Sequence, residues 1–470
     1  MTAQDSGSPA IEKKIQTYLE ALSPDAREML VRGIESAKVQ GDGDAHLEMI
    51  LAVVRAADGP QRKPGEVETA FKAEFFSPLQ PYLIDLSLSV RQRGRLSTAS
   101  LEPIWTWLKR DVGRDLIGKA LQATAVSSDP LPKAAASYAA RVRKKILPMG
   151  QNYIKALSKD EDDRHRLAGQ LGDKNTLADA KDALDVFQYY QAVDEALTNT
   201  PEVLHDEPED LLQPQIEVIN AFADDHPDMV HLLAVRYLGH VSTPAVLVRL
   251  ARMASNATTV FAIEKSIYKP FVDVAWSEID RCVEVVRARN NLSDRQGTLE
   301  EALLDLHRTV RRIQIAIDGE GTTDWGRRLS NCRRETSGIL RETIEGIPGL
   351  VIHAVRLRKK DDKIQAPDAD AVDAAREALK VLGAARLAID SLALTNIVNK
   401  ARAQVEQVIE NTSKNHIERL RNAPSDERKV LSEIVEVVIE YARIVFGEEY
   451  ADLVHRSLHI ASTKANLKSA

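Results

Sequence analysis

The chain has 470 residues, of which 44% are hydrophobic and 28% are charged, and its net charge is −7. A chain of this length can build more than one core, and its negative charge argues against a dedicated nucleic-acid binder, although local basic patches remain compatible with it. The two cysteines, Cys282 and Cys332, are too few for a disulfide framework and predict reduced, partly buried thiols.

Apolar residues recur three and four positions apart from about Ser8 to about Ile460, a spacing typical of amphipathic helices. Only 5% of the residues are aromatic, so the core is expected to consist mainly of aliphatic side chains and alanine. We therefore predict an all-α protein, built as an elongated set of bundles or an irregular helical array with little or no β-structure. No repeat of about 34–47 residues can be aligned, which argues against a regular solenoid.

The first half of the chain predicts two domains. Residues 1–57 fit a small helical hairpin or bundle, and a segment with two prolines and two glycines, 56–66, ends it. Residues 67–200 fit a second helical domain, with helices over 67–76 and 177–197. Six aromatic residues within this domain predict a local hydrophobic cluster: Phe71, Phe75, Phe76, Tyr82, Trp105 and Trp107.

The second half begins with an acidic segment. Residues 201–228 contain nine acidic residues, no lysine or arginine, and four prolines, which predicts a hinge broken into short pieces. Residues 229–470 then predict a bundle of long helices. The expected helices cover 270–290, 298–318, 325–345 and 369–412, the last about 60 Å long if it is unbroken, and a final hairpin starts at Pro424 and breaks at Gly447.

Two acidic motifs have the residue types of metal sites. Asp224, Asp225 and Asp228 resemble the DDxxD carboxylates that hold magnesium in all-helical prenyl-diphosphate synthases, but Pro227 interrupts the helix that such a site needs. A solvated acidic loop at the start of the next helix is the alternative that we favour. His205 and Asp206 resemble the dyad of HD-type phosphohydrolases, yet Pro208 places them in a broken segment.

Basic clusters suggest binding of anions. Arg91, Arg93 and Arg95 surround Gly94 just before three hydroxyl residues, an arrangement that could hold a phosphate or an acidic peptide at a helix start. A solvated turn is the alternative interpretation. A further cluster lies at a predicted helix end, where it needs no ligand because cations suit the helix dipole there: Arg141, Arg143, Lys144 and Lys145.

A longer basic stretch, 327–360, contains nine basic and three acidic residues. It could pair with the acidic segment, within the fold or between subunits, or form an interaction surface for another protein. Trp325 is the one aromatic residue beside it, which disfavours a groove for nucleic acid. The arginines expected to form the surface are Arg327, Arg328, Arg333, Arg334, Arg356 and Arg358.

Five sequence phrases resemble a family of uncharacterised, cytoplasmic, all-helical bacterial proteins. They are GRLSTASLEPIWTWL (94–108), HPDMVHLLAVRYLG (226–239), EIDRCVEVVRA (278–288), WGRRLSNCRRETSGIL (325–340) and VFGEEYADLV (445–454). The resemblance implies a helical fold and a bacterial source. It implies no activity, cofactor or catalytic residue.

The function predicted from these patterns is that of a non-enzymatic cytosolic scaffold, adaptor or regulator that binds another protein. No Walker loop, GxGxxG, HExxH, GxSxG or paired CxxC is present, so we assign no catalytic residue and no cofactor. No apolar stretch is long enough to insert into a membrane, and a homo-oligomer is compatible with the charge pattern. The alternative is a helical enzyme or sensor for a phosphorylated small molecule, with magnesium at 224–228 or phosphate at 91–95.

Overall fold

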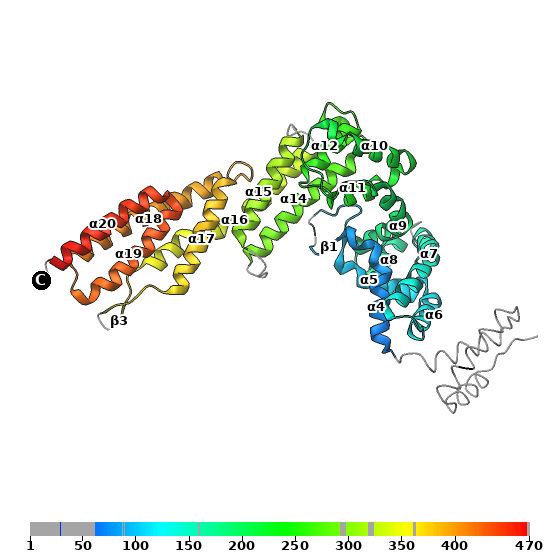
Figure 1. Ribbon diagram of the computed structural model, residues 1–470, viewed down its shortest axis with the longest axis horizontal. Helices are drawn as coiled ribbons and strands as arrows, with labels where there is room; N and C mark the ends of the chain where they lie inside the picture. Colours follow the sequence, from blue (N-terminus) through cyan, green and yellow to red (C-terminus); the bar gives the residue numbers. More distant parts are fainter. Residues whose placement is uncertain are drawn as a thin grey trace, which may run out of the picture. The chain divides into compact units, whose positions relative to one another are not determined.

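The computed structural model describes Met29 and residues 62–86, 88, 90–157, 160–291, 298–317, 324–360 and 363–467. The predicted N-terminal domain, 1–57, lies outside these residues except for Met29. The described chain is all-α, as predicted (Figure 1), and its strands are limited to two pairs of two-residue strands. No helix of the described part combines the length and the apolar character that a membrane crossing requires.

The chain divides into two compact units. The first unit consists of Met1–Asp85 and Arg93–Glu195, and the second of Leu86–Gln92 and Ala196–Ala470. The elements of the first unit are α4 (Pro64–Phe76), η1 (Ser77–Tyr82), β1 (Leu83–Ile84), β2 (Leu96–Ser97), η2 (Thr98–Ser100), α5 (Leu101–Trp107), the π-helical turn η3 (Leu108–Val112), α6 (Arg114–Ala125), α7 (Leu131–Leu157), α8 (Glu161–Leu171) and α9 (Lys174–Leu197).

The predicted aromatic cluster forms the core of the first unit. Phe71, Phe75 and Phe76 on α4 contact the ring of Trp105 on α5, with centroids 5.5–6.1 Å apart. Phe187 on α9 joins them through edge contact with Phe75 at 5.2 Å. Burying such rings contributes more to stability than any other part of a core, so α4, α5 and α9 are held together here.

The second unit begins with helices that precede a long helical pair. Its first elements are α10 (Glu209–Asp225), η4 (Pro227–Met229), α11 (Val230–Leu238), α12 (Ala245–Ala254), α13 (Val260–Glu264), α14 (Lys269–Asn290) and α15 (Leu299–Ile317). α14 packs along α15, and α12 packs against both. The start of α15 has the expected capping box: Thr298 Oγ1 accepts from the Glu301 amide at 3.1 Å, and Glu301 accepts from the Thr298 amide at 3.0 Å.

The prediction that prolines break 201–228 into short pieces is wrong. α10 runs through Pro214 for 17 residues and buries Leu212, Ile216, Ile219 and Phe222 on one face. An interior proline costs a helix about 3 kcal/mol, whereas each of these side chains contributes about 1.5–3 kcal/mol when it is buried. Burial of the apolar face therefore outweighs the proline.

The remaining elements of the second unit form a bundle of long helices (Figure 1). They are α16 (Asp324–Val355), β3 (Lys359–Lys360), β4 (Lys363–Ile364), α17 (Ala369–Leu387), α18 (Thr395–Asn422), α19 (Ser425–Phe446) and α20 (Glu448–Leu467). α16 is longer than the predicted 325–345, since the helix continues through Pro348, which is buried. The final hairpin breaks at Gly447, as predicted, where φ is 93°.

The unbroken helix expected over 369–412 is also wrong. The chain leaves the helical path between α17 and α18, and Ala393 has a φ of 54°. Leu392 and Leu394 are fully buried in this turn, and the Ser391 hydroxyl donates to the Ala388 carbonyl at 3.1 Å. Burial of the two leucines and the hydrogen bond of Ser391 thus stabilise the turn in place of a continued helix.

Candidate functional site

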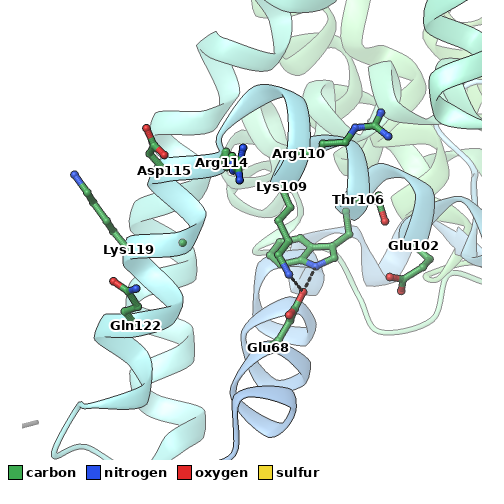
Figure 2. A pocket seen from close by; sticks show the side chains of 11 residues that line it. Glu68, Glu102, Thr106, Lys109, Arg110, Arg114, Asp115, Lys119 and Gln122 are labelled. Carbon is green, nitrogen blue, oxygen red and sulfur yellow. Dashed lines mark hydrogen bonds and ion pairs between the residues drawn. The ribbon is translucent and has the colours of Figure 1, made fainter.

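A cleft of the first unit has a volume of about 930 Å³ and lies among α4, α5, η3 and α6 (Figure 2). Glu68 on α4 accepts from Lys109 Nζ at 2.6 Å and from the indole Nε1 of Trp105 at 2.9 Å. These two bonds, with that of Lys109 the larger, lower the pKa of the Glu68 carboxyl. A helical π-turn positions Lys109, and such turns often occur at functional sites.

Several charged side chains around this cleft nevertheless pair with neighbours of opposite charge. Lys72 pairs with Glu102, and Arg110 makes a bidentate contact with the neighbouring Asp111 at 2.7 and 2.8 Å. Figure 2 shows Asp115, Lys119 and Gln122 projecting from α6, away from the Glu68–Lys109 contact. The cleft is lined by four basic and three acidic side chains, so it favours neither anions nor cations: Lys109, Arg110, Arg114, Lys119, Glu68, Glu102 and Asp115.

The predicted phosphate loop is directed at carboxylates of α9. The Arg93 guanidinium lies 3.6 Å from Asp185, and the Gly94 amide donates to Asp182 at 2.7 Å. Asp179 accepts from the Ser97 amide and from the Ser100 hydroxyl. Because the three aspartates share one helical face, they take the donors that a phosphate would need. Arg95 is half-buried in the same unit, and Arg91 belongs to the second unit.

The three aspartates of the predicted magnesium motif do not form a common site. Asp224 and Asp225 end α10, Asp228 lies in η4, and all three are exposed. Their carboxylate oxygens do not converge within the distance that one ion would require. The favoured acidic loop differs from the structure at Asp224 and Asp225, which are helical, whereas their exposure to solvent was expected.

Most of the six predicted interaction arginines make contacts within the fold. Arg327 and Arg328 pair with Asp324 and Asp280. Arg333 Nε donates to the Ser391 carbonyl at 2.9 Å, and Arg358 lies 3.0 Å from Asp368. The two that remain, Arg334 and Arg356, are exposed.

The basic stretch and the acidic segment have different partners. Among the described ion pairs, the acidic segment pairs with α12, through Asp206 with Arg249 and Glu209 with Arg252. The predicted pairing of the two stretches within the fold is therefore absent from the described residues. Both cysteines are free and buried, as predicted, and burial raises the pKa of each thiol to about 12, so neither is a thiolate near neutral pH.

A different surface combines exposed apolar side chains with arginines. Ile315 on α15 is 69% exposed and Leu387 at the end of α17 is 66% exposed, although both are large aliphatic residues. Arg311 and Arg312 lie one turn before Ile315 on the outer side of α15. These four side chains form the α15 surface.

Two hollows flank the α15 surface, and Ile315 lines both of them. One has a volume of about 500 Å³ and includes Leu387; the other has a volume of about 590 Å³ and lies between α12 and α15. The charged side chains of the first are Arg311, Arg333 and Asp390, and His307 also lines it. Those of the second are Asp206, Arg249, Arg252 and Arg312, and His205 also lines it.

His307 lies beside the arginines of this surface. Its Nδ1 lies 2.7 Å from the Ser391 hydroxyl, and its pKa is lowered by burial and by the cations of Arg311 and Arg308. Burial is the larger cause, and the nearby positive charges add to it because they oppose formation of imidazolium.

Sequence analysis missed the α15 surface, although a signal for it exists. The buried face of α15 contains Leu306, Val310, Ile313 and Ile317, and Ile315 lies off that face. An isoleucine outside the apolar stripe, one turn after two arginines, predicts an exposed apolar residue beside cations.

No family model matches the sequence, and no curated protein or solved structure was found to be similar to it.

Proposed function

We propose that this protein is a helical scaffold or adaptor that acts by binding another protein, and that the α15 surface is its docking site. The observation that carries the proposal is the exposure of Ile315 and Leu387 beside Arg311 and Arg312 on well-packed helices. Covering a large aliphatic side chain yields about 1.5–3 kcal/mol, and protein interfaces typically surround such residues with arginines.

The alternative, an enzyme or sensor for a phosphorylated small molecule, has less support. Arg93 and the Gly94 amide contact aspartates of α9, and the aspartates of 224–228 are exposed without converging on one point. The hollow that contains His205 and Asp206 has arginines, but Arg249 pairs with Asp206 itself and Arg252 lies 3.7 Å from Glu209. A compact phosphate site would leave these guanidiniums unpaired.

Affinity capture with the full chain tests the proposal. Wild type, the double variant Ile315→Ser/Leu387→Ser and the control Leu211→Ser are immobilised and exposed to an extract of the source cells. Leu211 on α10 is 57% exposed, so its change matches the loss of apolar surface elsewhere in the second unit. Each captured protein is then purified and its dissociation constant is measured.

We expect a partner that binds wild type and the control alike and binds the double variant at least about tenfold more weakly, because two apolar anchors are lost. Circular dichroism should be the same for all three proteins, since the changed side chains are exposed. If no purified protein distinguishes wild type from the double variant, the α15 surface is not a docking site.

A further inference from the structure

Resting on this proposed function, we infer that the segment which occupies the α15 surface is an acidic amphipathic helix of the partner protein. The charged side chains lining the two hollows are five arginines against two aspartates. A surface of this sign attracts a segment rich in Asp and Glu and repels a basic one. The inference concerns the chemistry of the partner, whereas the proposed function concerns only its docking site.

The cations at the centre of the surface are available to a partner. Arg249 and Arg252 face Asp206 and Glu209, and Arg333 donates to the Ser391 carbonyl. Arg311 and Arg312, in contrast, are exposed and make no hydrogen bond or ion pair with any residue that the structure describes. Position in the last turns of α15 favours cations through the helix dipole, but it does not account for an exposed isoleucine beside them.

The apolar residues indicate a helix rather than an extended acidic chain. Ile315 lines both hollows, and Leu387 lines one of them, so apolar side chains of a partner can contact Ile315 from either side. An amphipathic helix supplies such anchors at positions three and four apart, with acidic residues beside them to meet Arg311 and Arg312.

A nucleic acid fits the same surface less well. Neither hollow is lined by Phe, Tyr or Trp, the large rings on which bases usually stack, and the exposed anchors are aliphatic. The chain has a net charge of −7, whereas proteins that bind nucleic acids by neutralising phosphates are usually basic.

Fluorescence anisotropy with the full chain and designed peptides tests the inference. The probe is a labelled peptide of about 18 residues with Leu at positions three and four apart, Glu beside them and Ala elsewhere, so that length and alanine content favour a helix. Two matched peptides replace every Glu by Lys or every Leu by Ser. The protein variants are Arg311→Glu/Arg312→Glu and the control Arg421→Glu/Arg456→Glu, which changes exposed arginines of α18 and α20.

We expect the Leu/Glu peptide to bind wild type at least about tenfold more tightly than either matched peptide. Arg311→Glu/Arg312→Glu should weaken its binding at least about tenfold and strengthen binding of the Lys peptide, whereas the control should change neither. Raising the salt from about 50 mM to about 300 mM should weaken binding of the Leu/Glu peptide, because added ions screen the charge contacts. Such a charge swap cannot arise from misfolding.

The inference fails if the Glu and Lys peptides bind equally, or if the charge reversal leaves their order unchanged. It also fails if single-stranded DNA displaces the Leu/Glu peptide more effectively than unlabelled peptide does, which would assign the surface to nucleic acid. If wild type is a dimer and Ile315→Ser/Leu387→Ser makes it a monomer, the α15 surface binds a second copy of the chain. If a purified partner depends on Ile315 and Leu387 while the Leu/Glu peptide does not bind, the proposed function stands and the acidic helix is rejected.

Discussion

The pKa of His307, which contacts Ser391, offers a way to measure the electrostatic effect of the arginines near the α15 surface. His307 lies among Arg308 and Arg311 of its own helix and shares its hollow with Arg333 of α16 and with Asp390, which follows α17. Burial, followed by the positive charges of Arg311 and Arg308, disfavours the imidazolium and holds the pKa of His307 below its ordinary value of 6.5.

Arg311→Gln should therefore raise the pKa of His307, because removing a cation removes repulsion of the charged ring. An NMR titration that follows the ring protons of each histidine measures this. His416 on α18 serves as the internal control, since Arg311 is not among the causes of its own pKa shift. An unchanged titration of His307 in the variant would mean that Arg311 does not contribute to the field.

The sequence identified arginines more easily than it identified their roles. Arg328 and Arg333 stand in a basic stretch, but one pairs with Asp280 of α14 and the other bonds the Ser391 carbonyl. Such partners are remote in sequence, so no local pattern reveals that a cation is already satisfied. Arg311 and Arg312 lie in a less basic stretch and make no such contact with a described residue.

Among the elements, α10 shows that burial of an apolar face can keep a helix intact although it contains a proline. Pro214 is exposed on its outer side, while the opposite face supplies buried apolar residues to the second unit. Proline lacks the amide that would donate to the Asp210 carbonyl one turn earlier. The helix persists with that bond missing, so the residue is a local weakness in a stable element.

Pro214→Ala should stabilise the second unit by about 1–2 kcal/mol. The new amide restores a helical hydrogen bond and removes a steric clash, and the greater freedom of the unfolded chain offsets part of the gain. Urea unfolding followed by circular dichroism measures the change. Pro208→Ala is the matched control, because Pro208 caps α10 and no helical bond is missing there. Equal effects of both changes would contradict this account.

Helices with a regular apolar period were predictable, and their interruptions were not. The predicted 298–318 and 270–290 agree closely with α15 and α14, because spacing and caps are local properties. The turn between α17 and α18 depends instead on burial of Leu392 and Leu394 by distant helices. Nothing in the segment itself reports which neighbours will cover those leucines.

For the whole molecule, the fold class follows from period and composition, whereas the docking site depends on how several helices meet. The α15 surface combines side chains of α15 and α17, and α12 lines one of the two hollows beside it. Each helix is amphipathic in isolation, and only their packing decides that Ile315 and Leu387 stay uncovered and that Arg311 and Arg312 have no carboxylate partner among the described residues. A function that resides on such an exterior leaves no compact motif in the sequence.

Acid stability of the whole chain follows from buried groups of opposite sign. His416 on α18 is buried with Nε2 3.2 Å from the Val355 carbonyl of α16, and burial lowers its pKa below 6.5. The unfolded state then binds the proton more readily, so stability is complete above about pH 6.5 and falls as the pH drops below it. Burial raises the pKa of Asp280 and Glu284, which gives the opposite dependence, but these carboxyls titrate from lower reference values of 3.8 and 4.5.

We therefore expect the free energy of unfolding to decrease between about pH 7.5 and pH 5.5, by at most about 1.4 kcal/mol per pH unit for each histidine. His416→Gln should reduce this slope, because glutamine can still donate to the Val355 carbonyl but takes up no proton. Urea unfolding at about pH 7.5, 6.5 and 5.5 gives the slope for both proteins. Some slope should remain in the variant, since the pKa of His307 is lowered as well. Equal slopes in the two proteins would show that protonation of His416 does not destabilise the folded state. The contact between α16 and α18 would then tolerate a buried charge.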